Sequence, residues 1–231
     1  MSKLQHVEAN GLDFAYFTQG DGPLVLMMHG FPDTPHTWDH ARPAVAAAGY
    51  RVVTPFTRGY HPTQIPGDGA GDAASFGTDT LGGDVVALIE ALSGDEPAIV
   101  VGHDWGASAA YSAAALAPDR VALLVTLAIP HPASMVPTPK LMWSVRHFMS
   151  LRFKGSSEMA RKNDFAYIDE LVRRWSPSWD VPANETKHVK EAFSQPGCLE
   201  AALGYYRAIG VMLPSSHRPK IAVPTVSFAG L

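Results

Sequence analysis

The sequence of 231 residues predicts an α/β fold: a mostly parallel, twisted sheet with helices on both faces and a helical lid inserted before the last strand present. Short apolar runs, which suit strands buried on both faces, alternate with longer helical stretches between residues 23 and 129. This alternation predicts right-handed crossovers and hence parallel strands. The pattern is helical from 140 to 210 and strand-like again from 221 to 231, which predicts the lid.

The chain opens with a hairpin, a strand and a helix. Asn10 and Gly11 lie between two strand-like runs within residues 7–20, which is a strong hairpin signal. Residues 23–30 form a continuous apolar run bounded by turn residues, so they predict a strand buried on both faces. Residues 37–49 predict a helix that closes at its C-terminal glycine.

Five more elements complete the regular part of the chain. The β-branched run 50–56 and the apolar runs 97–102 and 121–129 predict strands. The segment 107–120 is rich in small residues and predicts a helix, and so does 81–94. In 81–94 the apolar residues fall on one helical face: Leu81, Val85, Leu88, Ile89 and Leu92.

Two proline groups mark the borders of the lid, at 130, 132, 137 and 139 and again at 214, 219 and 224. We therefore expect an α/β core in residues 1–130 and a helical lid, or cap domain, in 131–217. Residues 218–231 bring the chain back to the core as a strand. A lid in this position would lie over the carboxyl ends of the strands, where open parallel sheets carry their chemistry.

The composition excludes several classes of protein. Hydrophobic residues make up 46% and charged residues 17%, which is enough apolar surface for a core and argues against disorder. The net charge of −4, from 18 basic and 22 acidic residues, gives no reason to expect nucleic acid or an anionic membrane as a partner. Cys198 is the single cysteine, so an internal disulfide cannot form. The first ten residues lack the apolar stretch of a signal peptide, and 121–129 is too short to span a bilayer, so we expect a cytoplasmic protein.

The residues 102–106, Gly-His-Asp-Trp-Gly, join a buried strand to a helix. Small residues two positions before and after a central residue allow the tight turn of a nucleophile elbow, which pushes that residue out above the sheet. The central residue is Asp104, which at its ordinary pKa is already ionised at neutral pH and needs no base to attack carbon. Attack on a saturated carbon gives an ester on the enzyme. Hydrolysis of that ester then needs a base and an oxyanion hole.

These residues resemble the α/β-hydrolase family, and within it the epoxide hydrolase group, along essentially the whole chain. "HGFP" at 29–32 is similar to the family's oxyanion motif, and "GHDWG" at 102–106 to its aspartate elbow, which haloalkane dehalogenases share. "TRGY" at 57–60 is also typical of the group. The resemblance implies that the backbone N–H groups of Phe31 and Trp105 form the oxyanion hole.

In this group, lid side chains protonate the departing epoxide oxygen. "YYRAI" at 205–209 resembles the later donor segment, which makes Tyr206 the first candidate and leaves Tyr205 for packing. The earlier donor should lie in the first lid helix, where "SVRHF" at 144–148 contains no tyrosine. Some relatives pair a histidine with the tyrosine, so His147 is the second candidate.

The family also places an acid after a late strand and a base histidine in a later loop. No histidine follows the strand at 221–231, and no carboxylate directly follows the strand at 121–129. By this resemblance the chain is expected to be truncated and to lack the base and its acid. It would then form the ester without turning over. We also expect an exposed sheet edge and poor solubility.

The function predicted from the sequence is hydrolysis of a small apolar epoxide by water to a vicinal diol. One alternative is a haloalkane dehalogenase, although that group usually has a polar residue where Phe31 stands. Another is a non-catalytic binder of small apolar molecules. The histidines show no metal-ligand spacing, and the glycines of 67–77 do not follow a strand, so neither a metal nor a dinucleotide cofactor is expected.

Overall fold

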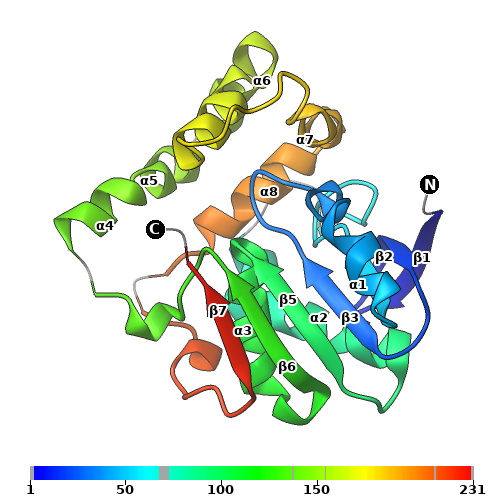
Figure 1. Cartoon of the computed structure of the whole chain (residues 1–231). Helices are drawn as coiled ribbons and strands as arrows, with labels where there is room; N and C mark the ends of the chain where they lie inside the picture. Colours follow the sequence, from blue (N-terminus) through cyan, green and yellow to red (C-terminus); the bar gives the residue numbers. More distant parts are fainter. Residues whose placement is uncertain (1–2, 68–72, 137, 154, 211, 230–231) are drawn as a thin grey trace.

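The computed structural model describes residues 3–67, 73–136, 138–153, 155–210 and 212–229, and within them one seven-stranded sheet (Figure 1). Residues 68–72 of the glycine-rich segment 67–77 lie outside these residues. The strands are β1 (Leu4–Ala9), β2 (Leu12–Gln19), β3 (Leu24–Met28), β4 (Arg51–Pro55), β5 (Ala98–His103), β6 (Val121–Leu127) and β7 (Thr225–Phe228). Their order across the sheet is β1-β2-β4-β3-β5-β6-β7.

The sheet is mostly parallel, as the sequence predicts. β4, β3, β5, β6 and β7 run parallel, whereas β2 is antiparallel to both β1 and β4. The hairpin between β1 and β2 turns at Asn10 and Gly11, which have φ of 44° and 74°. A two-residue turn with both central residues left-handed is the type I′ geometry that Asn-Gly favours.

Both faces of the sheet are covered by helices, which explains the unbroken apolar run of β3. Leu26 and Met28 belong to the larger core, together with buried residues of α2 (Thr78–Ser93) and α3 (Trp105–Leu116). Val25 and Met27 belong to a second core, against which α1 (Ala41–Ala47) packs. A strand with both faces buried has no position that favours a polar side chain.

The helix predicted for 37–49 is shorter in the structure. α1 begins at Ala41, and residues 35–38 form a separate 3₁₀ turn. Pro43 explains the late start, because its ring has no N–H to donate and would clash with the carbonyl of residue 39 if the helix extended further back. Proline is tolerated only in the first turn of a helix, and Pro43 lies there.

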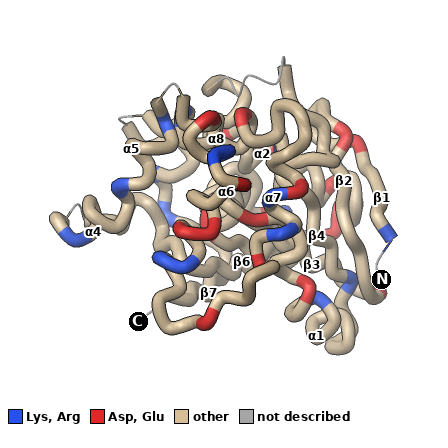
Figure 2. The backbone as a smooth tube through the Cα atoms, turned by 90° about the horizontal axis from the view of Figure 1, so that it is seen from above, with Lys and Arg blue, Asp and Glu red and all other residues tan. Residues whose placement is uncertain are grey.

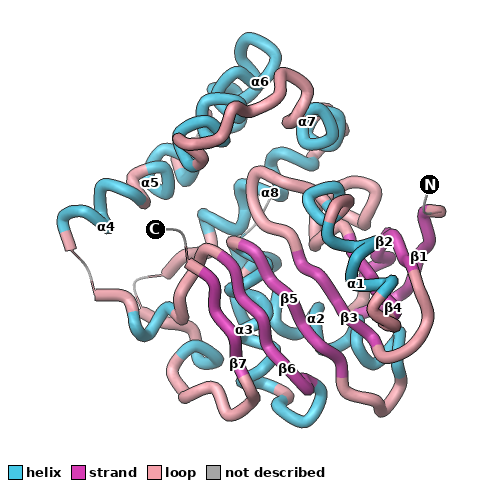
Figure 3. The backbone as a smooth tube through the Cα atoms, in the orientation of Figure 1, coloured by secondary structure: helices cyan, strands magenta, loops and turns pink. Residues whose placement is uncertain are grey.

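Five helices follow β6 before the chain returns to the sheet at β7. They are α4 (Pro139–Ser144), α5 (His147–Arg152), α6 (Ser156–Trp175), α7 (Lys187–Phe193) and α8 (Cys198–Arg207), and we call them the cap helices. They lie above the carboxyl ends of the parallel strands (Figures 1 and 3). α8 forms much of the floor of this layer, and nearly all its side chains are buried. The division into a core and a cap domain at residues 130 and 217 stays a prediction.

α6 is interrupted, which the sequence pattern does not predict. Lys162 is extended, and the next three residues, Asn163, Asp164 and Phe165, are left-handed with φ between 51° and 58°. The helical periodicity of 157–175 continues across this break, so the pattern predicts a single helix. Two ion pairs link the interrupted region of α6 to α7. Lys190 Nζ in α7 lies 3.3 Å from Asp164 Oδ2 and 2.9 Å from Asp169 Oδ2.

β7 is the edge of the sheet next to β6, and its four residues are exposed. Val226 and Phe228 are 44% and 59% exposed.

Acidic and basic residues are interspersed over the described surface seen from above, where α6 and α7 carry both signs (Figure 2). Ion pairs between these residues, such as Lys187 with Glu191, keep the charges locally balanced. No helix in the described part of the chain is both long enough and apolar enough to cross a bilayer.

Candidate active site

The residue between β5 and α3 is Asp104, with φ 53° and ψ −121°. This left-handed conformation is rare for a residue with a side chain and marks a sharp turn. Gly102 and Gly106 make the turn possible. A Cβ on Gly102 would lie 2.7 Å from Cα of Ala107, and one on Gly106 would lie 2.8 Å from the carbonyl oxygen of His29. The two glycines therefore let the strand, the turn and the helix pack backbone against backbone.

The loop after β3 approaches Asp104 from the other side. A Cβ on Gly30 would lie 2.5 Å from Cβ of Asp104 and 2.7 Å from the backbone nitrogen of Trp105, so only glycine fits. This close approach brings the Phe31 N–H to 2.9 Å from Asp104 Oδ1. The backbone N–H of Trp105 also hydrogen bonds to this carboxylate. The structure thus places both predicted oxyanion donors on the side chain of Asp104.

His29 holds this loop to the neighbouring loop after β4. It is fully buried, its Nδ1–H donates to the Gly30 carbonyl at 3.0 Å, and its Nε2 accepts from the Thr57 N–H at 3.1 Å. Burial lowers the pKa of His29 to about 3, against the smaller opposing effect of the Gly30 hydrogen bond. His29 is therefore a neutral structural group that fixes the position of the Phe31 N–H.

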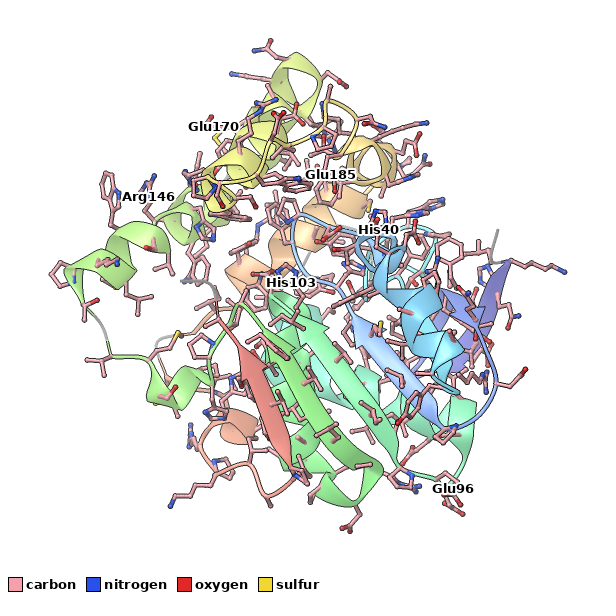
Figure 4. The ribbon with its side chains drawn as sticks, viewed as in Figure 1. His40, Glu96, His103, Arg146, Glu170 and Glu185 are labelled. Carbon is pink, nitrogen blue, oxygen red and sulfur yellow. The ribbon has the colours of Figure 1, made fainter. Side chains whose placement is uncertain are left out.

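The neutral His29 predicts a dependence of stability on pH. Its pKa is about 3 in the folded state and near 6.5 in the unfolded chain, so between these values the unfolded state binds more protons. The stability from this residue is complete above pH 6.5 and is lost as the pH falls, by about 1.4 kcal/mol per pH unit. Urea unfolding at pH 7 and pH 5 measures the loss. His29→Asn should remove most of this slope, whereas His40→Asn, at an exposed position (Figure 4), should keep it. Equal slopes in the parent and His29→Asn would contradict the assignment.

Opposing effects act on the ionisation of Asp104. The pKa of its carboxyl group is raised because burial outweighs the charge of His103 and the N–H groups of Phe31 and Trp105, which lower it. The two N–H groups donate, so they bind the anionic form. His103 lies at the end of β5, facing the cap helices, and Glu185 extends from the cap above it (Figure 4).

Tyr206 on α8 packs against Phe31 and Trp105, the two residues whose N–H groups hold this carboxylate. Its ring is T-shaped to Phe31 at 5.2 Å and to Trp105 at 5.3 Å between centroids, and the side chain is fully buried. Burial and the charge of Asp104 raise its pKa well above the usual range, and the Trp105 side chain lowers it. Its hydroxyl forms no regular hydrogen bond to another described residue. Tyr205, in contrast, donates its hydroxyl to the Arg58 carbonyl at 2.7 Å.

His147 at the start of α5 lies beside Tyr206, with 6.0 Å between ring centroids. Its Nδ1 is 3.2 Å from the Ser144 carbonyl oxygen, so this nitrogen carries the proton and donates. Burial lowers the pKa of His147 to about 4, with further lowering by Arg174 and Arg146. At neutral pH the ring is therefore uncharged, and its Nε2 accepts a proton in this tautomer.

Two residues near the site, Asp33 and Tyr60, were not predicted from the sequence to be functional. Asp33 directly follows "HGFP"; burial raises its pKa to about 6, against the Thr34 N–H, and Glu185 raises it further. Tyr60 is the last residue of "TRGY", and its buried hydroxyl has no partner among the described residues. The position of Asp33 next to one motif and of Tyr60 within another is the signal that could have found them.

A buried ion pair supports the floor of the site. Arg58 Nε lies 2.7 Å from Asp84 Oδ2 in α2, and Asn10 Nδ2 donates to Asp84 Oδ1 at 2.7 Å. The pair ties the loop after β4 to α2 and to the hairpin. Because the Arg58 carbonyl accepts from Tyr205, the same network holds the chain next to Tyr206.

In the described part of the chain, no group of three or more histidine, cysteine or carboxylate side chains is arranged to hold a metal ion. What the site offers chemically is one carboxylate at a sharp turn, two N–H donors on it, and the buried aromatic side chain of Tyr206 packed against Phe31 and Trp105.

A family model described as alpha/beta hydrolase fold matches residues 23–153. The AB hydrolase superfamily protein YfhM of Bacillus subtilis is 33% identical over 214 residues, which are 90% of this chain and 73% of that protein. An epoxide hydrolase of Caballeronia sordidicola is 40% identical over 98 residues, which are 42% of this chain but 28% of that protein. The alignment with this second relative therefore spans less than a third of its length.

Solved structures agree with the architecture. The epoxide hydrolase VrEH1 from Vigna radiata superposes with a TM-score of 0.80 at 25% sequence identity. The superposition covers 98% of this chain and 78% of the Vigna radiata chain.

Proposed function

The chain belongs to the alpha/beta hydrolase fold family, and on this premise we propose that it opens a small apolar epoxide to a vicinal diol through a covalent ester on Asp104. One arrangement supports the proposal most. The Asp104 carboxylate stands at a left-handed elbow, with the Phe31 N–H 2.9 Å from Oδ1 and the buried Tyr206 ring packed against Phe31 and Trp105. The epoxide hydrolases among its relatives favour the same reaction.

In the first step, the free oxygen of Asp104 forms a bond to one epoxide carbon, and the bond from that carbon to the epoxide oxygen breaks. The departing oxygen takes the proton of Tyr206. Ester hydrolysis then adds the oxygen of water to the carbonyl carbon, while the N–H groups of Phe31 and Trp105 stabilise the oxyanion. The bond between the carbonyl carbon and the alkyl oxygen breaks and releases the diol. One proton of the water goes to the alkyl oxygen of the departing diol. The other returns to the Tyr206 phenolate, which acts as the base of this step.

Each contact of the site suits one part of this reaction. The Phe31 N–H already binds Oδ1, which becomes the carbonyl oxygen of the ester and is held from the start. The raised pKa of Tyr206 keeps its proton on until an oxygen with developing negative charge arrives. The rings of Phe31, Trp105 and Phe148 around Tyr206 give the apolar surroundings that an epoxide needs.

Tyr206→Phe should slow ester formation from styrene oxide by about 10²-fold or more, because the alkoxide then leaves without general-acid assistance. Intact-mass spectrometry in a single-turnover experiment measures the rate. Tyr205→Phe is the matched control, since its hydroxyl is already occupied by the Arg58 carbonyl, and it should lose less than about tenfold. Equal rates in the parent and Tyr206→Phe would remove Tyr206 from the mechanism.

We assign the proton to Tyr206 rather than to His147. With its Nδ1–H donating to Ser144, His147 has its lone pair on Nε2, and its lowered pKa leaves little of the charged form at neutral pH. As a second donor it would have to carry the proton on Nε2 instead. With the proton on Nδ1, His147 lines the site beside Tyr206.

The haloalkane dehalogenase alternative shares Asp104 and differs in the leaving group. Its halide would meet the apolar ring of Phe31 rather than a polar side chain, which favours the epoxide. Faster alkylation of Asp104 by a bromoalkane than by the matching epoxide would reverse this preference. Reversible binding of both compounds with no ester would favour the non-catalytic binder.

A further inference from the structure

Tyr60 is a buried donor without an acceptor. The residue is 1% exposed, and its hydroxyl makes no hydrogen bond to a described residue. Among the described residues, two buried tyrosine hydroxyls lack a partner, those of Tyr60 and Tyr206. Buried hydroxyls in proteins are nearly always satisfied, so an orphan donor needs an explanation, and a ligand is one.

The ring of Tyr60 contacts the aromatic side chains that surround Asp104. It is T-shaped to His29 at 4.8 Å, and it lies 5.7 Å from Phe193 and 6.2 Å from Tyr205 between centroids. Phe193 in turn stacks on Phe31 at 5.7 Å. Tyr60 thus belongs to the same aromatic shell as the residues that hold and cover Asp104.

The hydroxyl of Tyr60 also lies within electrostatic reach of the reacting groups. Burial raises its pKa well above the usual range, and charges on Tyr205, Tyr206, Cys198 and Asp104 raise it further. A phenol in these surroundings keeps its proton at neutral pH. It can therefore donate or accept a hydrogen bond, but it carries no charge.

The backbone of the loop leaves little freedom to this side chain. The Tyr60 N–H donates to the Thr57 carbonyl at 2.9 Å, and Gly59 turns with φ 78°. A Cβ on Gly59 would lie 2.7 Å from Cβ of Ala201, so the loop packs directly against α8. Tyr60 lies on the loop after β4, and Tyr206 lies on the cap helix α8.

We propose that the Tyr60 hydroxyl is a second hydrogen-bond donor to the epoxide oxygen, acting with Tyr206. This inference rests on the proposed function. As the carbon–oxygen bond of the epoxide breaks, the departing oxygen accepts hydrogen bonds from both phenols and takes one proton, that of Tyr206. The proton of Tyr60 stays in place, so the balance of atoms and charges in the reaction is unchanged.

The test compares two reagents that each carry one phenyl group. Opening of styrene oxide by Asp104 leaves an alkoxide, which needs donors. Displacement of bromide from 2-phenylethyl bromide leaves an anion that needs no proton. Rates of ester formation with both reagents are measured by intact-mass spectrometry for the parent, Tyr60→Phe and the control Tyr205→Phe, with circular dichroism to verify folding.

We expect Tyr60→Phe to slow the epoxide reaction by about 10-fold to 100-fold and the bromide reaction by less than about threefold. Tyr205→Phe should change both rates alike. A loss in both reactions, or in neither, would overturn the donor role of Tyr60. If neither reagent alkylates Asp104 in the parent, the proposed function itself fails, and that result is distinct from a failure of Tyr60.

Discussion

Replacing Asp104 by asparagine is expected to lower the rate of ester formation from an epoxide by on the order of 10⁴-fold or more. The amide nitrogen and oxygen of asparagine are poor nucleophiles at saturated carbon. The fold should persist, because the side-chain oxygen of asparagine can still accept from the Phe31 N–H, as Asp104 Oδ1 does at 2.9 Å. Intact-mass spectrometry with styrene oxide measures the change.

Asp95→Asn is the control for this experiment. The side chain of Asp95 is fully exposed and pairs only with surface Arg120, so its replacement should leave the rate unchanged. Ester formation by Asp104→Asn at a rate within tenfold of the parent would mean that another group is the nucleophile. A loss of folding in Asp104→Asn would show in its circular dichroism spectrum.

Gly106→Ala is expected to have the largest effect on stability, a loss of about 2–4 kcal/mol in the free energy of unfolding. The added Cβ would overlap the Met28 carbonyl group, whose carbon would lie 2.6 Å away, and would lie 2.8 Å from the His29 carbonyl oxygen. These atoms are backbone in the central strand β3 and the loop after it, so they cannot rotate away. Because the same loop carries the Phe31 N–H, ester formation should fall as well.

Gly83→Ala in α2 is the matched control. Near its Cβ position, the contact is Nδ2 of Asn10 at 3.4 Å, which is an ordinary van der Waals distance. Alanine is favoured over glycine inside a helix by about 1 kcal/mol, so this variant should be as stable as the parent or more stable. Urea unfolding of both variants gives the comparison. A Gly106→Ala variant as stable as the parent would contradict the tight packing at the elbow.

The fold was predictable because its strongest features are local. Asn10-Gly11 encodes its own turn, and the apolar run of β3 encodes burial on both faces. Details that depend on competing effects were harder to predict from the sequence. The start of α1 depends on one proline in its first turn, and the break in α6 lies within an unbroken helical pattern.

The candidate site also has features that the sequence predicts and features that it does not. The resemblance of the motifs at 29–32 and 102–106 to a known family implies which backbone N–H groups meet Asp104, and the glycines of these motifs allow the close approach. Nothing in the sequence predicts the tautomer of His147, which depends on a carbonyl three residues before it. The role we propose for Tyr60 depends on the absence of a hydrogen-bond partner, which only coordinates can reveal.

The most direct test of the covalent mechanism is to locate the adduct. The chain is incubated with styrene oxide, digested with trypsin and sequenced by tandem mass spectrometry. Our account predicts that the peptide spanning 59–120 gains the mass of one styrene oxide and that the fragment ions place it on Asp104. An adduct on any other residue, with Asp104 unmodified, would contradict it.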